Sequence, residues 1–215
     1  PNPILWTQAK PVFVDCTRDT LTLDLEDLKR KISPHSRVLI IQHTFGQVAA
    51  LEELLALARA HNLFVIEDCA HALGAQFKGK PVGTFGDASF FSFGRDKTLS
   101  SVFGGMALIK DPAREAAMRA YQNRLPWPSL RWTLQQLLYA PLSWLIKQTY
   151  DLGIGKALLF LARTGRLIAR PVETQEKQGE APSFLSYRFS SALTRLALHQ
   201  YKKRLRFTAH RLHRA

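Results

Sequence analysis

The first half of the chain alternates short apolar runs with segments of helical periodicity. Successive apolar side chains mark five runs as strands, at residues 12–15, 38–42, 63–67, 88–93 and 105–109. Because such strands are apolar on both faces, they are typical of a sheet covered by helices on both sides.

Two segments between these runs predict helices. Residues 49–61 carry leucines at four positions of one helical face and two acids near the helix start, where negative charge is favourable. Residues 24–31 predict a shorter helix, capped by Thr22 or Asp24. Strands and helices in this alternation predict an α/β fold with a mostly parallel sheet and flanking helices.

The pattern changes after residue 120. Leucines and an isoleucine recur at near-helical spacing between residues 134 and 146, with Pro141 breaking or kinking the helix, and residues 153–155 predict a turn into a second helix. Residues 173–180 are polar and predict a surface linker. A long basic helix is predicted over 187–214. The chain is therefore expected to have three parts: residues 1–120, a helical insertion and linker at 121–182, and a helix at 183–215.

Charge is distributed unevenly between the halves. Residues 1–110 carry 12 Lys and Arg against 11 Asp and Glu, whereas residues 111–215 carry 18 against 6, a net charge of +12. Such an excess suits nucleic acid, anionic lipid or a nucleotide-linked substrate, although a solvated helical face explains it equally well. Helix-turn-helix, zinc-finger and RNA-binding signatures are lacking, so nucleic acid is not favoured.

The basic segment 125–170 also holds tryptophans and leucines. This composition is typical of an amphipathic element on a membrane surface, with cations on anionic lipid. Packing of the apolar face on the body of the protein, or on a second subunit, is the favoured alternative. No run of eighteen uncharged apolar residues predicts a membrane span. Two cysteines, Cys16 and Cys69, indicate a reduced, cytoplasmic setting rather than a disulfide framework.

Polar residues follow the apolar runs where parallel strands would end. Asp15, His43 and Asp68 fall at such ends, and Ser92 leads into a glycine-containing turn that ends at Lys97. Ligands collect at the carboxyl ends of strands, so we expect these side chains to share one cleft. Asp68 either caps the next helix or faces a cationic group. Lys97 is either a surface lysine or an amine that attacks aldehydes.

Five motifs follow one another along this half. Residues 40–47 read Ile-Ile-Gln-His-Thr-Phe-Gly-Gln, 65–75 Val-Ile-Glu-Asp-Cys-Ala-His-Ala-Leu-Gly-Ala, 80–87 Lys-Pro-Val-Gly-Thr-Phe-Gly-Asp, 91–99 Phe-Ser-Phe-Gly-Arg-Asp-Lys-Thr-Leu, and 104–107 Gly-Gly-Met-Ala. In this order they resemble the DegT/DnrJ/EryC1/StrS family of pyridoxal-phosphate sugar aminotransferases. The resemblance covers residues 10–112 and resumes weakly near 186–214. It implies the large domain of the aspartate-aminotransferase fold, known as fold type I.

The resemblance also implies roles for individual residues. Lys97 would be the Schiff-base lysine of pyridoxal 5'-phosphate, and Asp68 would keep the pyridine nitrogen protonated. Ser92 would donate its hydroxyl to the cofactor phosphate, and His71 would contact the cofactor. His43 would line the substrate cleft or serve as a structural histidine at a strand end.

Departures from the family pattern set expectations as well. Phe45 stands where the family commonly has tyrosine, so a hydroxyl role there is lost. A glycine- and threonine-containing phosphate segment would precede residue 12, and the chain stops inside a helix. We therefore expect an internal fragment of a longer enzyme, one that holds the lysine and the aspartate without the whole cofactor site.

The function implied by the resemblance is amino-group transfer. An amino acid, by family habit glutamate, would donate to a keto group of a nucleotide-linked sugar for cell-surface polysaccharide biosynthesis, in a homodimer. The alternative is a catalytically idle or regulatory relative whose basic second half binds an anionic membrane surface or another polyanion. Lys97, Asp68 and Ser92 together favour the enzyme.

Overall fold

The computed structural model describes residues 2–165, 167–168 and 174–214 of the chain. Two compact units make up the protein. One, called the sheet unit, comprises Lys10–Leu99 and Gly105–Asn123. The other, called the helical unit, comprises Pro1–Ala9, Ser100–Gly104 and Arg124–Ala215.

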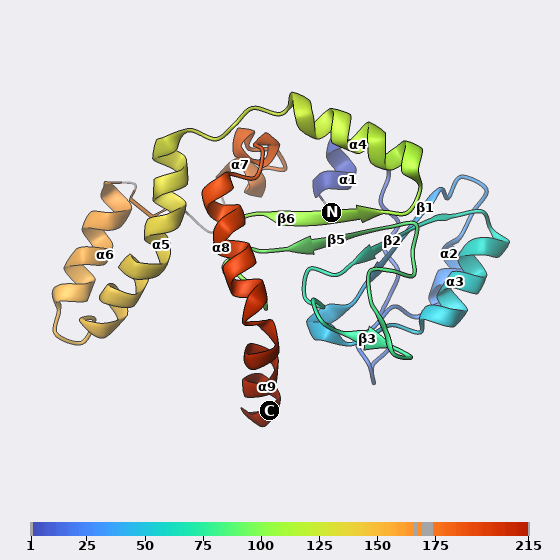
Figure 1. Cartoon of the computed structure of the whole chain (residues 1–215). Helices are drawn as coiled ribbons and strands as arrows, with labels where there is room; N and C mark the ends of the chain where they lie inside the picture. Colours follow the sequence, from blue (N-terminus) through green and yellow to red (C-terminus); the bar gives the residue numbers. More distant parts are fainter. Residues whose placement is uncertain (1, 166, 169–173, 215) are drawn as a thin grey trace. The chain divides into compact units, whose positions relative to one another are not determined.

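A four-stranded sheet in the order β1-β2-β5-β6 forms the centre of the sheet unit (Figure 1). The strands β1 (Val38–Gln42), β2 (Phe64–Asp68) and β5 (Ala88–Ser92) are parallel, and β6 (Gly105–Ile109) runs antiparallel to β5. This confirms the predicted mostly parallel sheet. Since β1, β2 and β5 point the same way, their carboxyl ends meet at one edge of the sheet.

Two helices cover one face of this sheet. The helix α2 (Leu25–Lys31) is capped by Asp24, whose side chain accepts hydrogen bonds from two backbone N–H groups of the first turn. The helix α3 (Leu51–Ala60) buries its apolar stripe, as its leucine spacing predicted. The resulting core joins both helices to the inward side chains of β1 and β2: Leu28, Leu39, Ile41, Leu51, Leu54, Ala58 and Val65.

The opposite face of the sheet is open among the described residues. Val38 and Ile40 of β1 and Phe90 of β5 are exposed there, and β6 is exposed along most of its length. Within the sheet unit, the helical cover expected on both faces is therefore seen mainly on one. The helix α4 (Pro112–Arg124) does supply one contact, because the guanidinium of Arg114 lies 4.7 Å from the ring centre of Phe64.

Residues 12–15 do not form the predicted strand. Only an isolated bridge between Cys16 and Leu23 follows them, and Val12 and Phe13 are exposed. The backbone N–H of Asp15 donates to Asp27 Oδ2 at 2.8 Å, which ties the segment to α2 rather than to a neighbouring strand. An apolar run becomes a strand only where a partner offers a ladder of hydrogen bonds. A small antiparallel pair, β3 (Gln76–Phe77) with β4 (Lys80–Pro81), completes the unit.

The helical unit contains the predicted hairpin. Its first helix, α5 (Leu130–Gln148), starts at the N-cap Ser129 and continues through Pro141, and its second, α6 (Ile154–Thr164), packs against it. Gly153 adopts a left-handed conformation at the turn, with φ of 78°. Gly155 makes the close approach possible, because a Cβ atom there would collide with the backbone of Ile146 and Tyr150.

The end of the chain differs from its prediction as one helix over residues 187–214. A 3₁₀ turn spans Ser183–Ser186, and Ser190 caps α8 (Ser191–Lys202) by accepting a hydrogen bond from Leu193 N–H. The helix α9 (Arg204–Arg214) follows after a break at Lys203. Within the predicted linker, residue 173 lies outside the described residues and Thr174–Lys177 forms the short helix α7. A further short helix, α1, spans Asn2–Trp6. No helix among the described residues combines the length and the apolar character that crossing a membrane would require.

Candidate active site at the carboxyl ends of the strands

Lys97 lies in the turn that follows β5, and its amine is held by two side chains. Its Nζ atom is 2.8 Å from His71 Nε2 and 3.1 Å from Asp96 Oδ2, and its side chain is 16% exposed. An ammonium at Lys97 would donate to Nε2 of His71, and the proton of a neutral His71 ring would then lie on Nδ1. That buried Nδ1 atom has no hydrogen-bond partner among the described residues. The predicted lysine and histidine are thus brought together.

Phe45 stacks on the far side of this pair. Its ring lies parallel to that of His71, with 5.2 Å between the ring centres and an interplanar angle of 5°. The Phe45 backbone is left-handed at φ of 52°, and the following Gly46 has φ of 84°. A left-handed conformation costs a non-glycine residue about 1 kcal/mol, and such residues gather at functional sites. Sequence reasoning treated Phe45 only as a lost hydroxyl. The Phe-Gly pair after a strand was the signal that it missed.

Asp68 and Ser92 end adjacent strands at the same edge. Asp68 is half-buried at the end of β2, and its Oδ1 accepts a hydrogen bond from Ala70 N–H at 3.0 Å. Residues 69–74 form turns rather than a helix, so this contact caps a turn and not the predicted helix. Ser92 Oγ, at the end of β5, accepts from Gly94 N–H at 3.3 Å. Its hydroxyl hydrogen can therefore donate to another acceptor.

Asp96 gives the Lys97 amine a charged neighbour at the surface. The hydrogen bond from Lys97 lowers the pKa of the Asp96 carboxyl below its usual value, although its slight burial opposes the shift. The carboxylate therefore stays ionised and acts as a mostly solvent-exposed acceptor for the ammonium. Sequence reasoning had not singled out Asp96.

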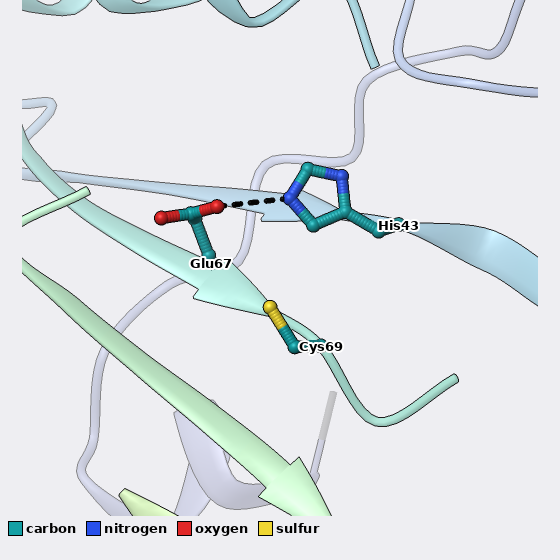
Figure 2. A group of neighbouring side chains, drawn as sticks. All are labelled: His43, Glu67 and Cys69. Carbon is teal, nitrogen blue, oxygen red and sulfur yellow. Dashed lines mark hydrogen bonds and ion pairs between the residues drawn. The ribbon is translucent and has the colours of Figure 1, made fainter. Parts of the chain in front are cut away.

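Behind the strand ends, Glu67 and His43 form a fully buried pair. Figure 2 shows the Glu67 carboxylate pointing from β2 towards the His43 ring, with 3.1 Å between Oε2 and Nε2. Backbone N–H groups fill the remaining positions of this carboxylate, donated by Gly83 at 2.8 Å and by Phe85 and Gly86 at 2.7 Å. Burial alone would raise the pKa of Glu67, but the hydrogen bonds from His43 and the three N–H groups lower it below its usual value. Glu67 therefore fixes the loop at residues 83–86 to β2.

Cys69 completes a group of metal-ligand type in Figure 2. The ligand atoms of His43, Glu67 and Cys69 lie within 4.8 Å of one another. However, the Glu67 oxygens already accept four hydrogen bonds, and a coordinating cysteine must be a thiolate. Burial, followed by the charges of Glu67 and Asp68, raises the pKa of the Cys69 thiol to about 12. This chemistry favours a structural anchor over a metal centre.

His43 and Asp15 are the two remaining residues of the predicted cleft. His43 is buried against Glu67, which favours the structural alternative, and its substrate role stays a prediction. Asp15 is tied by its backbone to α2: its N–H donates to Asp27 and its carbonyl accepts from Asp24 N–H. The residues that the structure gathers at the sheet edge are therefore Lys97 with His71, beside the strand ends that carry Asp68 and Ser92.

The donor set at this edge fits pyridoxal phosphate. It offers an amine for an aldehyde, a carboxylate for a ring nitrogen and a hydroxyl for a phosphate, from Lys97, Asp68 and Ser92. His71 adds a buried Nδ1 atom that has no hydrogen-bond partner among the described residues. These four groups would hold the cofactor.

Comparison with known proteins gives a consistent family match. Residues 1–124 match the model of the DegT/DnrJ/EryC1/StrS aminotransferase family. The GDP-perosamine synthase of Escherichia coli O157:H7 is 43% identical over 110 residues, which cover 51% of this chain and 30% of that protein. The matching segment thus spans less than a third of that relative.

Two solved structures extend the comparison to the fold. The structure described as DesI in the presence of its TDP-sugar product is 35% identical, with a TM-score of 0.53 over 57% of this chain and 31% of that one. PseC of Helicobacter pylori, an aminotransferase, gives a TM-score of 0.63 over 94% of this chain and 43% of that one, at 19% identity. The second likeness shows the fold alone, and together the two confirm the expected fold type I.

Proposed function

Because the chain belongs to the DegT/DnrJ/EryC1/StrS aminotransferase family, we propose that the whole protein is a pyridoxal-phosphate-dependent aminotransferase acting on a nucleotide-linked keto sugar. The observation that carries the proposal is the Lys97 amine, which is held 2.8 Å from His71 Nε2 at the edge where Asp68 and Ser92 end their strands. The substrate class is supported by the GDP-linked sugar in the name of the E. coli relative and the TDP-sugar product in the DesI structure.

Pyridoxal phosphate, when bound, supplies an aldehyde for an amine and a ring that accepts electrons. In this proposal Lys97 Nζ would be the amine for the aldehyde and would carry a proton, and Asp68 would hold the proton of the ring nitrogen. Ser92 Oγ donates to the phosphate. His71 positions the amine through Nε2, and Phe45 keeps the His71 ring in place by stacking on it.

The amino donor and the assembly belong to the same proposal. We infer that an amino acid, in the first instance glutamate, donates the amino group, and that two copies of the protein associate. The free thiols of Cys16 and Cys69 suit a reduced, cytoplasmic setting. Amino-group transfer from glutamate and from glutamine to a keto sugar nucleotide, measured in parallel, would identify the donor.

The direct test is covalent capture of the cofactor. We expect the full-length protein incubated with pyridoxal phosphate to form a yellow adduct that borohydride reduces, and peptide mass spectrometry to place the reduced cofactor on Lys97. The Lys97→Ala variant should lose that adduct. The matched control is Lys80→Ala, which removes an exposed lysine of the same unit and should leave the adduct unchanged. The same adduct on the Lys97→Ala variant would show that the lysine is wrongly assigned.

The second candidate function gives a different outcome in this experiment. An idle or regulatory relative would form no reducible adduct at residue 97, even in the full-length protein with saturating cofactor. The side chains at the strand ends favour the enzyme, because Lys97, Asp68 and Ser92 are all present there. The basic helical unit is the observation that keeps the second candidate open.

A further inference from the structure

The helix α5 exposes several leucines, and two of its three buried residues are polar. Thr133 and Gln136 are buried together with Ile146, whereas Leu130, Leu134 and Leu138 are exposed. A helix that packs only on its own protein normally shows the reverse arrangement. The exposed leucines of α5 recur at intervals of four residues and so form a stripe along one side of the helix.

The helix α6 continues this exposed apolar surface. Gly155 and Ala162 face inward, seven residues apart, while Ile154 and Leu161 form an exposed pair with the same spacing. Phe160 is also exposed, at 68%. At the turn between the helices, Leu152 is 74% exposed. Large apolar side chains gathered in this way indicate a contact surface.

The charged residues of the hairpin are almost all basic. Residues 130–164 contain Arg131, Lys147, Lys156 and Arg163 against a single acid, Asp151. On α6, Lys156 and Arg163 lie seven residues apart, so they share one side of the helix, next to Phe160. An exposed apolar stripe bordered by lysine and arginine is the pattern of a helix that lies in a membrane interface.

We propose that the exposed apolar and basic surface of α5 and α6, called the hairpin surface, binds an anionic phospholipid membrane. The leucines and aromatic rings enter the headgroup boundary, and the four cations meet lipid phosphates. Two copies of this chain fit the surface less well. A two-fold interface places the same patch on both sides, so a patch with net charge +3 would face itself. The hairpin lies in the interface and does not cross the bilayer, in keeping with the absence of a spanning helix among the described residues.

Vesicle sedimentation of the full chain tests this inference. We expect binding to vesicles of phosphatidylcholine with phosphatidylglycerol, little binding to phosphatidylcholine alone, and weaker binding at high salt. Phe160→Glu should lower the partition coefficient about tenfold or more, because a charge replaces an apolar ring at the boundary. Its matched control is Phe13→Glu, the same change at a phenylalanine with the same 68% exposure in the sheet unit, and it should have little effect.

A second pair of variants removes charge and keeps the apolar side chains. Lys156→Gln combined with Arg163→Gln should weaken binding about fivefold for each cation lost. The control combines Lys10→Gln with Lys80→Gln, which removes the same charge from exposed positions of the sheet unit. Circular dichroism would show that all four variants keep the helical content of the parent chain.

Three results would overturn the proposal. The first is an absence of binding to anionic vesicles, and the second is an equal loss of binding in each variant and its control. The third is a Phe160→Glu variant that dissociates a dimer in sedimentation velocity while vesicle binding stays unchanged, because the hairpin surface would then bind a second copy. The cofactor adduct at Lys97 is measured separately, so failure of the membrane proposal leaves the proposed enzymatic function untouched.

Discussion

The sheet unit and the α5–α6 hairpin place polar and apolar side chains in opposite ways. In the sheet unit the buried carboxylate of Glu67 accepts four hydrogen bonds, and the apolar residues of α2 and α3 close over one face of the sheet. In the hairpin, polar residues of α5 are buried and leucines are exposed. The buried polar groups of the sheet unit find their hydrogen-bond partners within the chain. The exposed leucines of the hairpin are covered by nothing among the described residues.

The boundary between the two arrangements coincides with the limit of the family match. The match ends at residue 124, and the sheet unit ends at Asn123. The two observations are independent, since one is a comparison of sequences and the other a division of the structure. The whole sheet unit therefore lies within the family match, whereas residues 125–215 of the helical unit lie beyond it.

Of the variants that test the contrast between the two units, removal of the Glu67 carboxylate should change stability the most. Glu67→Ala leaves His43, two buried N–H groups and the part-buried N–H of Phe85 without their acceptor, so we expect a loss of about 3–5 kcal/mol in the free energy of unfolding of the sheet unit. Urea unfolding followed by circular dichroism measures it. Amide exchange should rise at Gly83, Phe85 and Gly86.

The control for this variant is Glu53→Ala on the exposed side of α3, expected to change stability by less than about 0.5 kcal/mol. The four tryptophans, at positions 6, 127, 132 and 144, all belong to the helical unit. Their fluorescence therefore reports that unit alone. Suppose that Glu67→Ala shifts the urea midpoint seen by tryptophan fluorescence as far as the midpoint seen by circular dichroism. The two units would then unfold together, and their different arrangement of side chains would not make them differ in stability.

A second variant tests the close contact inside the hairpin. In Gly155→Ala the new Cβ atom meets the backbone of Ile146 and Tyr150, which cannot move aside as a side chain would. We expect α5 and α6 to separate locally, at a cost of about 1–3 kcal/mol, read from tryptophan fluorescence during urea unfolding. Gly165→Ala is the control, because its Cβ atom would meet one backbone oxygen at 3.1 Å and its φ is −75°. Equal midpoints for the two variants would contradict the tight contact at Gly155.

Much of the sheet unit could be predicted because its signals are local. The strands at residues 38–42 and 105–109 have their predicted bounds, and the helix after Asp24 starts where a capping aspartate precedes a leucine pattern. The segment 12–15 looked similar and failed. Its apolar residues find no neighbouring strand, and partner availability is a property of the fold rather than of the run itself.

Only part of the candidate site could be predicted from the sequence, because contacts between distant segments are a property of the fold. Lys97, Asp68, Ser92 and His71 came from motifs, and the structure places Lys97 against His71. The stacking of Phe45 on His71 depends on a left-handed backbone that no periodicity announces. Glu67 was hidden by its place in an apolar strand, because its partners come from a loop 16 to 19 residues further along the chain.

Acid should weaken the sheet unit through Asp27, and this effect is the smallest of the three. The hydrogen bonds from Lys31, the Asp15 N–H and Arg30 lower the pKa of the Asp27 carboxyl from 3.8 to about 2, although burial opposes this shift. A carboxyl with a lowered pKa stabilises the fold above its ordinary pKa, and this stability is lost as the pH falls through about 2. Asp27→Asn should therefore lower the urea midpoint at neutral pH and flatten its decline between about pH 4 and about pH 2.

The helical unit carries acids as well, among them Asp151, Glu176 and Glu180, so the loss that belongs to the Asp27 carboxylate is read as the difference between Asp27→Asn and the parent chain. Glu26→Gln is the control within α2, because it removes an exposed carboxylate that pairs with Lys29 at the surface, where such pairs contribute little. Its urea midpoint should follow the parent chain at every pH. Glu26→Gln could instead flatten the fall of the urea midpoint in acid as much as Asp27→Asn does. The fall would then reflect the summed charge of α2 and not the Asp27 carboxylate, which binds the Asp15 N–H.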